Sequence, residues 1–101
     1  MQDNSEITLD SVVVVAKEQV SSDLGDEVAI LGLRRNSYYS LAGTGRRIWE
    51  LLQKARPVRE IHAALLVRYE VDADRCRDDL LALLRRLRDE GLVEVAGEAS
   101  S

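Results

Sequence analysis

The first part of the chain carries three short apolar runs that predict β-strands. Residues 12–15 are four valines in succession, and β-branched side chains favour a strand over a helix. Two further runs follow at residues 28–33 and 38–41. The polar segment at residues 21–26 is typical of a turn, and Asn36 can adopt the left-handed conformation of a second, tighter one. Connections this short favour an antiparallel meander.

After Gly45 the apolar positions change to a helical period. Ile48, Leu51 and Leu52 predict a first helix over about residues 46–54. Pro57 is typical of the first turn of a second helix, which we expect to end near Tyr69. The chain therefore changes from strands to helices near its middle.

A third helix is predicted with both of its ends marked. Asp72 or Asp74 can cap its start, and Gly91 is suited to end it. One apolar stripe runs along it, formed by Cys76, Leu80, Leu83, Leu84 and Leu87. Residues 92–95 can form a final strand, the wing of a winged helix.

This order of elements predicts an α+β fold, with a three-stranded antiparallel sheet followed by a winged helix-turn-helix of three helices. So small a sheet must pack its apolar face on the helices. A length of 101 residues fits one domain. We expect that domain at residues 7–96, with disordered tails at residues 1–6 and 97–101, which are polar or built from small residues.

Composition narrows the cellular setting and the kind of partner. No basic segment followed by an apolar run opens the chain, and no apolar run approaches the roughly 20 residues of a membrane span. With a single cysteine, Cys76, these features predict a cytoplasmic protein without a membrane partner. The net charge of −4 and the pI of ≈ 5.0 argue mildly against a nucleic-acid partner.

Few residues could carry catalysis. His62 is the only histidine, and Cys76 lies on the apolar stripe, where a free cysteine is usually a small buried hydrophobe. One histidine and one cysteine do not make a zinc site. Gly43, Thr44 and Gly45 precede a helix but lack the ending of a phosphate-binding loop. We therefore expect no enzyme, no metal and no cofactor.

Several segments in a fixed order give the chain a family resemblance. Residues 39–52 read YSLAGTGRRIWELL and resemble the middle of PqqD-like proteins. The same order and approximate spacing continue in VREI at residues 58–61, YEV at residues 69–71, LLALLRRL at residues 80–87 and EGLV at residues 90–93. One departure is Ala42, where the family often has an asparagine that caps the first helix. Thr44 could cap instead, or the loop could bend differently.

The resemblance implies a three-stranded sheet joined to a winged helix-turn-helix, and a non-catalytic function. Such domains bind the leader segment of ribosomally made, post-translationally modified peptides. Some are fused to their enzymes, whereas this chain is similar to the free-standing ones of lasso-peptide pathways, which work with a leader protease and a cyclase. A free chain could be a monomer or a weak homodimer, because its open strand edge can pair with another copy.

The resemblance also implies where the leader binds: antiparallel to the third strand of the sheet and against the third helix. Backbone pairing would hold the peptide, and side-chain pockets would select it. The implied site residues are Arg35, Ser37, Tyr38, Tyr39, Ser40, Arg75, Cys76, Asp79, Leu80, Leu81 and Leu83. In a simpler interpretation the tyrosines only cover the sheet, and Arg75 pairs with Asp79 on an exposed helix flank.

The main alternative is a winged-helix DNA-binding transcriptional regulator. The third helix supplies the cations for it, namely Arg75, Arg77, Arg85, Arg86 and Arg88. Against it, the same segment holds six acidic residues: Asp72, Asp74, Asp78, Asp79, Asp89 and Glu90. A recognition helix presents its start to DNA, and this one starts acidic. A protein–protein adaptor without a peptide substrate is a third possibility.

Overall fold

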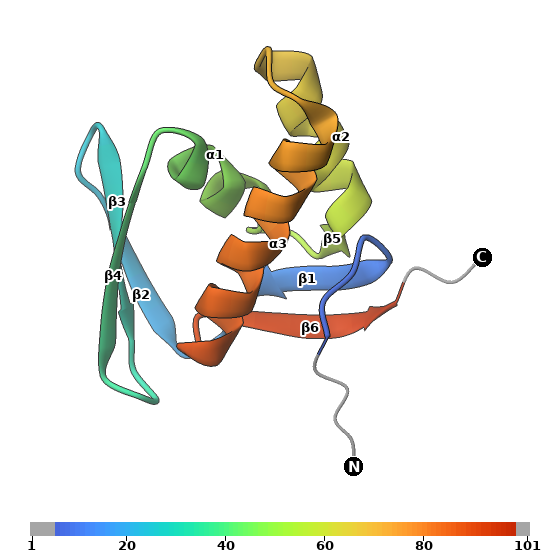
Figure 1. The fold of residues 1–101 in the computed structure, drawn as a ribbon. Helices are drawn as coiled ribbons and strands as arrows, with labels where there is room; N and C mark the ends of the chain where they lie inside the picture. The colour runs from blue at the N-terminus through green and yellow to red at the C-terminus, as the bar shows by residue number, and fades with distance from the viewer. Residues whose placement is uncertain (1–5, 99–101) are drawn as a thin grey trace.

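A three-stranded antiparallel sheet forms one side of the protein (Figure 1). The computed structural model describes residues 6–98. The sheet contains β2 (Gln19–Asp23), β3 (Glu27–Gly32) and β4 (Ser37–Ala42), with β3 in the centre. Asn36 has a φ of 55° in the turn before β4, which confirms its predicted left-handed conformation.

A second antiparallel sheet lies on the other side of the helices in Figure 1. Its central strand is β1 (Ser11–Val15), between β5 (Arg56–Pro57) and β6 (Val93–Glu98). β6 is the wing that the sequence predicted. It follows the third helix and returns beside β1, with Val15 opposite Val93.

Two details of the predicted sheet are wrong. The first valine-rich run, β1, belongs to the second sheet, and the place expected for it is taken by β2. The predicted turn at residues 21–26 contributes its first three residues to β2. The reason is that β2 is an exposed, polar edge strand without apolar alternation, so its pairing with β3 determines its conformation.

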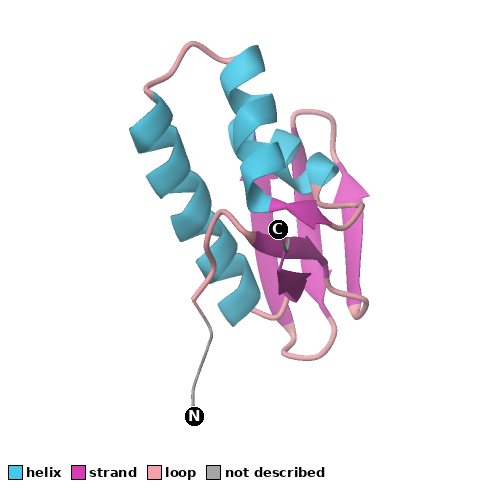
Figure 2. Cartoon of the chain, turned by 90° about the vertical axis from the view of Figure 1, so that its right-hand side faces the viewer, coloured by secondary structure: helices cyan, strands magenta, loops and turns pink. Residues whose placement is uncertain are grey.

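Three helices pack against the sheets: α1 (Thr44–Leu51), α2 (Val58–Arg68) and α3 (Ala73–Asp89). Figure 2 shows α2 and α3 joined by a loop at one end of the molecule, with the strands on one side of them. None of the helices in residues 6–98 is long and apolar enough to cross a membrane.

The helix ends show which local signals were correct. Asp72 caps α3, because its carboxylate accepts a hydrogen bond of 2.9 Å from the backbone N–H of Arg75. Gly91, with a φ of 79°, follows α3 as predicted. Thr44 does not cap α1; it is the first helical residue, and the loop instead bends at Gly43, whose φ is 57°.

One hydrophobic core joins both sheets to the helices. From the strands it includes Val13, Val28, Ile30, Leu41 and Val93, and from the helices Ile48, Trp49, Ile61, Leu65, Leu80, Leu84 and Leu87. Leu83 and Cys76 were expected in this core, but both are only half-buried and pack at its margin.

The C-terminal end of α3 is fastened to the hairpin of β3 and β4. The Arg35 guanidinium donates to the carbonyl of Asp89 at 2.8 Å, and the Ser37 hydroxyl donates to the carbonyl of Glu90 at 3.0 Å. Gly32 permits the close approach, because a Cβ there would lie only 2.8 Å from Cδ2 of Leu92. This end of β4 is therefore fixed relative to α3.

The predicted tails fall largely outside the described residues, which exclude residues 1–5 and 99–101. Inside the described part, Gly97 pairs with Val12 and the Glu6 carboxylate accepts from Arg85 at 2.8 Å. The limits of the domain stay a prediction.

Candidate functional site

The open edge of β4 is the first component of the site. β4 has β3 on one side only. Beyond the strand ladders, no backbone–backbone hydrogen bond within residues 6–98 involves residues 37–42. The backbone N–H and C=O groups that face away from β3 are therefore available to another extended chain.

Side chains along β4 alternate between the two faces of the sheet. Leu41 is 6% exposed and belongs to the core. Tyr39, on the same face, is half-buried and packs against the core. Tyr38 is 67% exposed on the opposite face, and Ser40 beside it is exposed as well. Tyr39 thus covers the sheet, while Tyr38 has no covering within the described chain.

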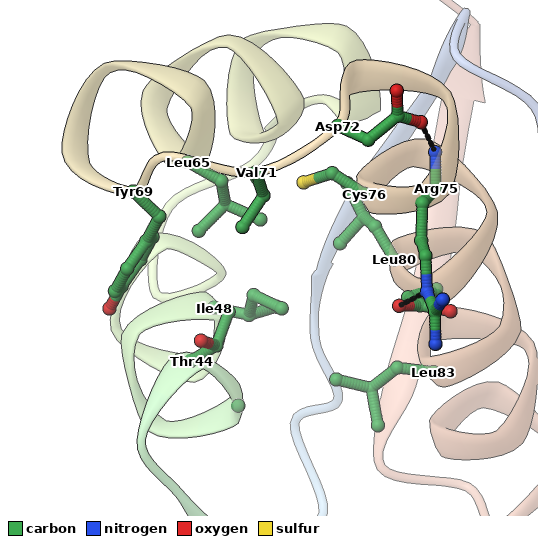
Figure 3. A pocket seen from close by; sticks show the side chains of 12 residues that line it. Thr44, Ile48, Leu65, Tyr69, Val71, Asp72, Arg75, Cys76, Leu80 and Leu83 are labelled. Atoms are coloured by element: carbon green, nitrogen blue, oxygen red, sulfur yellow. Dashed lines mark hydrogen bonds and ion pairs between the residues drawn. The ribbon is translucent and has the colours of Figure 1, made fainter.

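An apolar cavity of about 440 Å³ is the second component. It lies between the start of α1, the end of α2 and the first half of α3, and Figure 3 shows the side chains that line it. Its apolar walls are Ile48, Leu65, Tyr69, Val71, Leu80 and Leu83. Thr44 and Gly45 line it too, and they follow β4 directly in the chain. The cavity therefore opens at the Ala42 end of the free edge.

Charged side chains border the cavity on the α3 side. Arg75 and Asp79 line it and face each other at 3.8 Å, one helical turn apart and both exposed. An exposed pair of this kind is worth less than about 1 kcal/mol, so a bound peptide could exchange it for its own charges at little cost. Asp72, also at the rim, is held by its role as the cap of α3.

Cys76 lines the cavity as a thiol of low reactivity. Figure 3 shows its sulfur pointing toward Val71. Burial raises the pKa of the Cys76 thiol, and the negative charge of Asp79 raises it further. At neutral pH the side chain is therefore protonated and a weak nucleophile.

His62 bonds to the backbone at the start of α3. The Nε2 atom of His62 lies 2.9 Å from the carbonyl oxygen of Ala73, and since a carbonyl only accepts, this nitrogen donates. His62 does not line the cavity and instead links α2 to α3. Within residues 6–98, no group of three or more possible metal ligands comes together.

The structure brings together most of the residues expected at the site. Arg75, Cys76, Asp79, Leu80 and Leu83 all line the apolar cavity. The candidates from Ser37 to Ser40 lie on β4 as expected.

Two expected residues lie neither on β4 nor at the apolar cavity. Leu81 packs against the core and does not line the cavity. Arg35 lies at the opposite end of α3, where it holds the carbonyl of Asp89.

Sequence reasoning missed the far wall of the cavity. That wall is formed by Ile48, Leu65, Tyr69 and Val71, and none of them was expected at the site. One signal in the sequence was Val71, an apolar residue in the polar loop before Asp72. The structure leaves its side chain 51% exposed at the cavity.

Ion pairs engage several of the α3 cations that a DNA-binding function would need. Arg77 pairs with Asp78 at 3.1 Å, Arg85 with Glu6 at 2.8 Å and Arg88 with Asp89 at 3.2 Å. The start of α3 carries Asp72 and Asp74. This charge arrangement opposes contact between the start of α3 and a phosphate backbone.

The fold is a winged-helix domain extended by a three-stranded sheet with a free edge. A family model described as "Coenzyme PQQ synthesis protein D (PqqD)" matches residues 27–93, from β3 to the beginning of β6. The chain belongs to the PqqD family.

One solved structure is similar over most of the chain. It is described as "TbiB1 in Complex with the TbiA(beta) Leader Peptide", and it is 34% identical in sequence with a TM-score of 0.75. The similarity covers 80% of this chain and 94% of TbiB1. No curated protein sequence matches the chain.

Proposed function

We propose that this protein is a non-catalytic recognition element for ribosomally made, post-translationally modified peptides. It binds the leader segment of a precursor peptide, which adds a strand to β4, and it delivers the precursor to processing enzymes. The observation that carries the proposal is the free edge of β4, which leads into the apolar cavity beside α3. Membership of the PqqD family and the similarity to TbiB1, solved with a leader peptide, support it.

The two components of the site have different tasks. Six residues of β4 offer an edge of about 20 Å at roughly 3.3 Å per residue. Pairing along that edge uses only the peptide backbone and so tolerates many sequences. The cavity of about 440 Å³ then selects leaders with an apolar side chain at the matching position.

The charged rim adds a second level of selection. A leader residue that extends from the cavity toward α3 meets Arg75 and Asp79. Since both are exposed and only loosely paired, either can turn to an opposite charge on the leader. Binding needs no cofactor, and the cavity residues supply recognition without chemistry.

We infer further that the processing enzymes are a leader protease and a cyclase of the lasso-peptide type, in the cytoplasm. The resemblance to free-standing recognition proteins of those pathways supports this choice. Because the edge of β4 is open, a free chain is a monomer or a weak homodimer, and the leader competes with any second copy.

Fluorescence anisotropy tests the proposal directly. The probes are labelled leader peptides from precursor genes beside the gene for this chain, with the TbiA(beta) leader as a second probe. Scrambled peptides and a duplex DNA are the controls, each at two salt concentrations. We expect saturable binding of the leader with little salt dependence. Failure of every leader to bind, together with salt-sensitive binding of the duplex, would establish the DNA-binding regulator instead.

A further inference from the structure

A second, basic cavity lies at the opposite end of β4 from the apolar one. It measures about 680 Å³ and is bounded by the connection from β1 to β2, the turn before β4, the end of α3 and the start of β6. Four cations line it, namely Lys17, Arg34, Arg35 and Arg88. Two carboxylates, Glu18 and Glu94, also line it.

The charge of this cavity contrasts with that of the whole protein. Four cations against two carboxylates leave a local charge of 4 − 2 = +2, whereas the chain carries −4. An isolated positive concavity on an acidic protein concentrates anions at one place and leaves the rest of the surface repulsive to them.

The cations of this cavity are positioned but incompletely paired. The bond to the Asp89 carbonyl fixes Arg35, and Arg88 pairs with the Asp89 carboxylate at 3.2 Å while its Nη1 is buried with no hydrogen-bond partner. Arg34 meets Glu18 at 3.5 Å, with the two side chains 79% and 62% exposed. Such a pair is weak and can be exchanged for a stronger one.

The position of the basic cavity relates it to the peptide edge. Arg35 precedes Ser37, the first residue of β4, by two positions, and both side chains bind the last carbonyls of α3. The apolar cavity begins at the other end of the strand, at Thr44 and Gly45. A chain paired along β4 therefore has the apolar cavity at one end and the basic cavity at the other.

We propose that the basic cavity binds acidic residues of the leader that lie immediately C-terminal to the paired segment. This inference rests on the proposed function. In an antiparallel pair, the C-terminal end of the added strand lies beside Ser37, and the next leader residues pass Arg35. Their carboxylates accept hydrogen bonds from the ammonium group of Lys17 and the guanidinium group of Arg34, which are both exposed, while Arg35 and Arg88 add positive charge beside them. The selected class of ligand is a leader with an apolar anchor followed by acidic residues.

A peptide carboxylate suits this cavity better than nucleic acid. Glu18 and Glu94 lie among the cations and would repel a continuous phosphate backbone. Nucleic-acid binding depends on a stripe of cations that neutralises several phosphates in succession, and the net charge of −4 opposes it. One or two carboxylates on a short peptide need only the local excess.

The test uses one leader peptide, from the precursor gene beside the gene for this chain, in four forms. Three glutamates, three glutamines or three lysines follow the paired segment, and in the fourth form three glutamates precede it. The binding variant is Lys17→Gln with Arg34→Gln. The matched control is Lys54→Gln with Arg86→Gln, which removes the same charges from exposed residues that line neither cavity. Anisotropy is measured at about 50 mM and about 300 mM salt.

We expect the peptide with C-terminal glutamates to bind roughly fivefold or more tighter than the glutamine form at low salt, and the lysine form to bind more weakly. The advantage should shrink at high salt and disappear in the binding variant, but persist in the control. Unchanged affinity of the binding variant for the glutamine form shows that its fold is intact.

Five outcomes overturn the inference. An equal affinity for the glutamate and glutamine forms, or an advantage that survives in the binding variant, removes the role of the cavity and leaves the proposed function standing. An advantage only for N-terminal glutamates reverses the direction of the peptide. If the protein binds duplex DNA and the binding variant does not, the cavity is a nucleic-acid site. If no form of the leader binds, the proposed function fails as well.

Discussion

The hydroxyl of Ser37 donates a hydrogen bond of 3.0 Å to the carbonyl of Glu90, and so joins the first residue of β4 to the residue that ends α3. The two are 53 positions apart in the chain. This bond fixes the spacing between the free strand edge and the helix beside it. In the proposed function, a peptide between them meets a groove of set width, and we expect the affinity for the leader to depend on a contact that does not touch it.

We expect Ser37→Ala to lower the free energy of unfolding by about 1 kcal/mol, because it leaves the part-buried Glu90 carbonyl without this partner. Leader affinity should fall as the strand edge loosens. Urea denaturation measures the stability, and anisotropy measures the affinity. Ser40→Ala is the matched control, since its hydroxyl bonds only the exposed Glu27 carboxylate on the same strand pair. Equal loss of stability in both variants would contradict the role of the Ser37 bond.

Leu83 and Leu84 are neighbours on α3 with different expected roles. Leu84 is 0% exposed in the core, so Leu84→Ala should lower the free energy of unfolding by about 2–5 kcal/mol. Leu83 is half-buried and lines the apolar cavity, so Leu83→Ala should cost less stability and mainly weaken leader binding. Thermal denaturation and anisotropy separate the two effects. A Leu83 variant that is strongly destabilised but binds the leader normally when folded would exclude the cavity from the site.

The thiol of Cys76 should react slowly with a disulfide reagent at neutral pH. Its pKa is raised by burial and by Asp79, so the reactive thiolate is scarcer than in a free cysteine. Asp79→Asn removes the negative charge beside the thiol, so it should lower the pKa of Cys76 and speed the reaction. The rate is followed spectroscopically between about pH 7 and 9. Asp78→Asn is the control, since Asp78 does not line the cavity.

A bound leader should also protect Cys76 from the same reagent. The cavity that holds the sulfur is the one that the leader fills in the proposed function. Saturating leader should slow the modification further, and a scrambled peptide should not. Full reactivity in the presence of saturating leader would show that the peptide binds elsewhere.

Strand addition predicts a period of two along the leader. On an edge strand, alternate residues direct their backbone groups toward the neighbour. N-methylation of single leader amides should therefore weaken binding strongly at every second position and little at the positions between. Isothermal titration of a set of singly methylated peptides measures this pattern. A uniform loss, or a period near 3.6, would show that the leader binds as a helix.

The part of the fold that could be predicted from the sequence depends on local signals. The start of α3 at Asp72 and its end at Gly91 both follow from interactions within a few residues. β2 could not be predicted, because its exposed polar residues form a strand only through pairing with β3. The sheet to which β1 belongs depends on its pairing with β6, which lies some 80 residues further along the chain.

The candidate site also has a part that could be predicted from the sequence and a part that could not. The stripe of α3 gave Cys76, Leu80 and Leu83, because helical spacing places them on one face. Their opposite wall includes Ile48 of α1 and Tyr69, the residue directly after α2. Its position depends on how α1 and α2 pack on α3, and no periodicity within one segment encodes that packing.

The pairing of β1 with β6 determines where a second domain could be attached to this one. Ser11 and Glu98 lie opposite each other at one end of the sheet that contains both strands. In Figure 1 that sheet lies on the far side of α3 from β4. An enzyme joined through either strand would be attached away from the peptide edge. A second domain attached there would leave the open edge of β4 accessible.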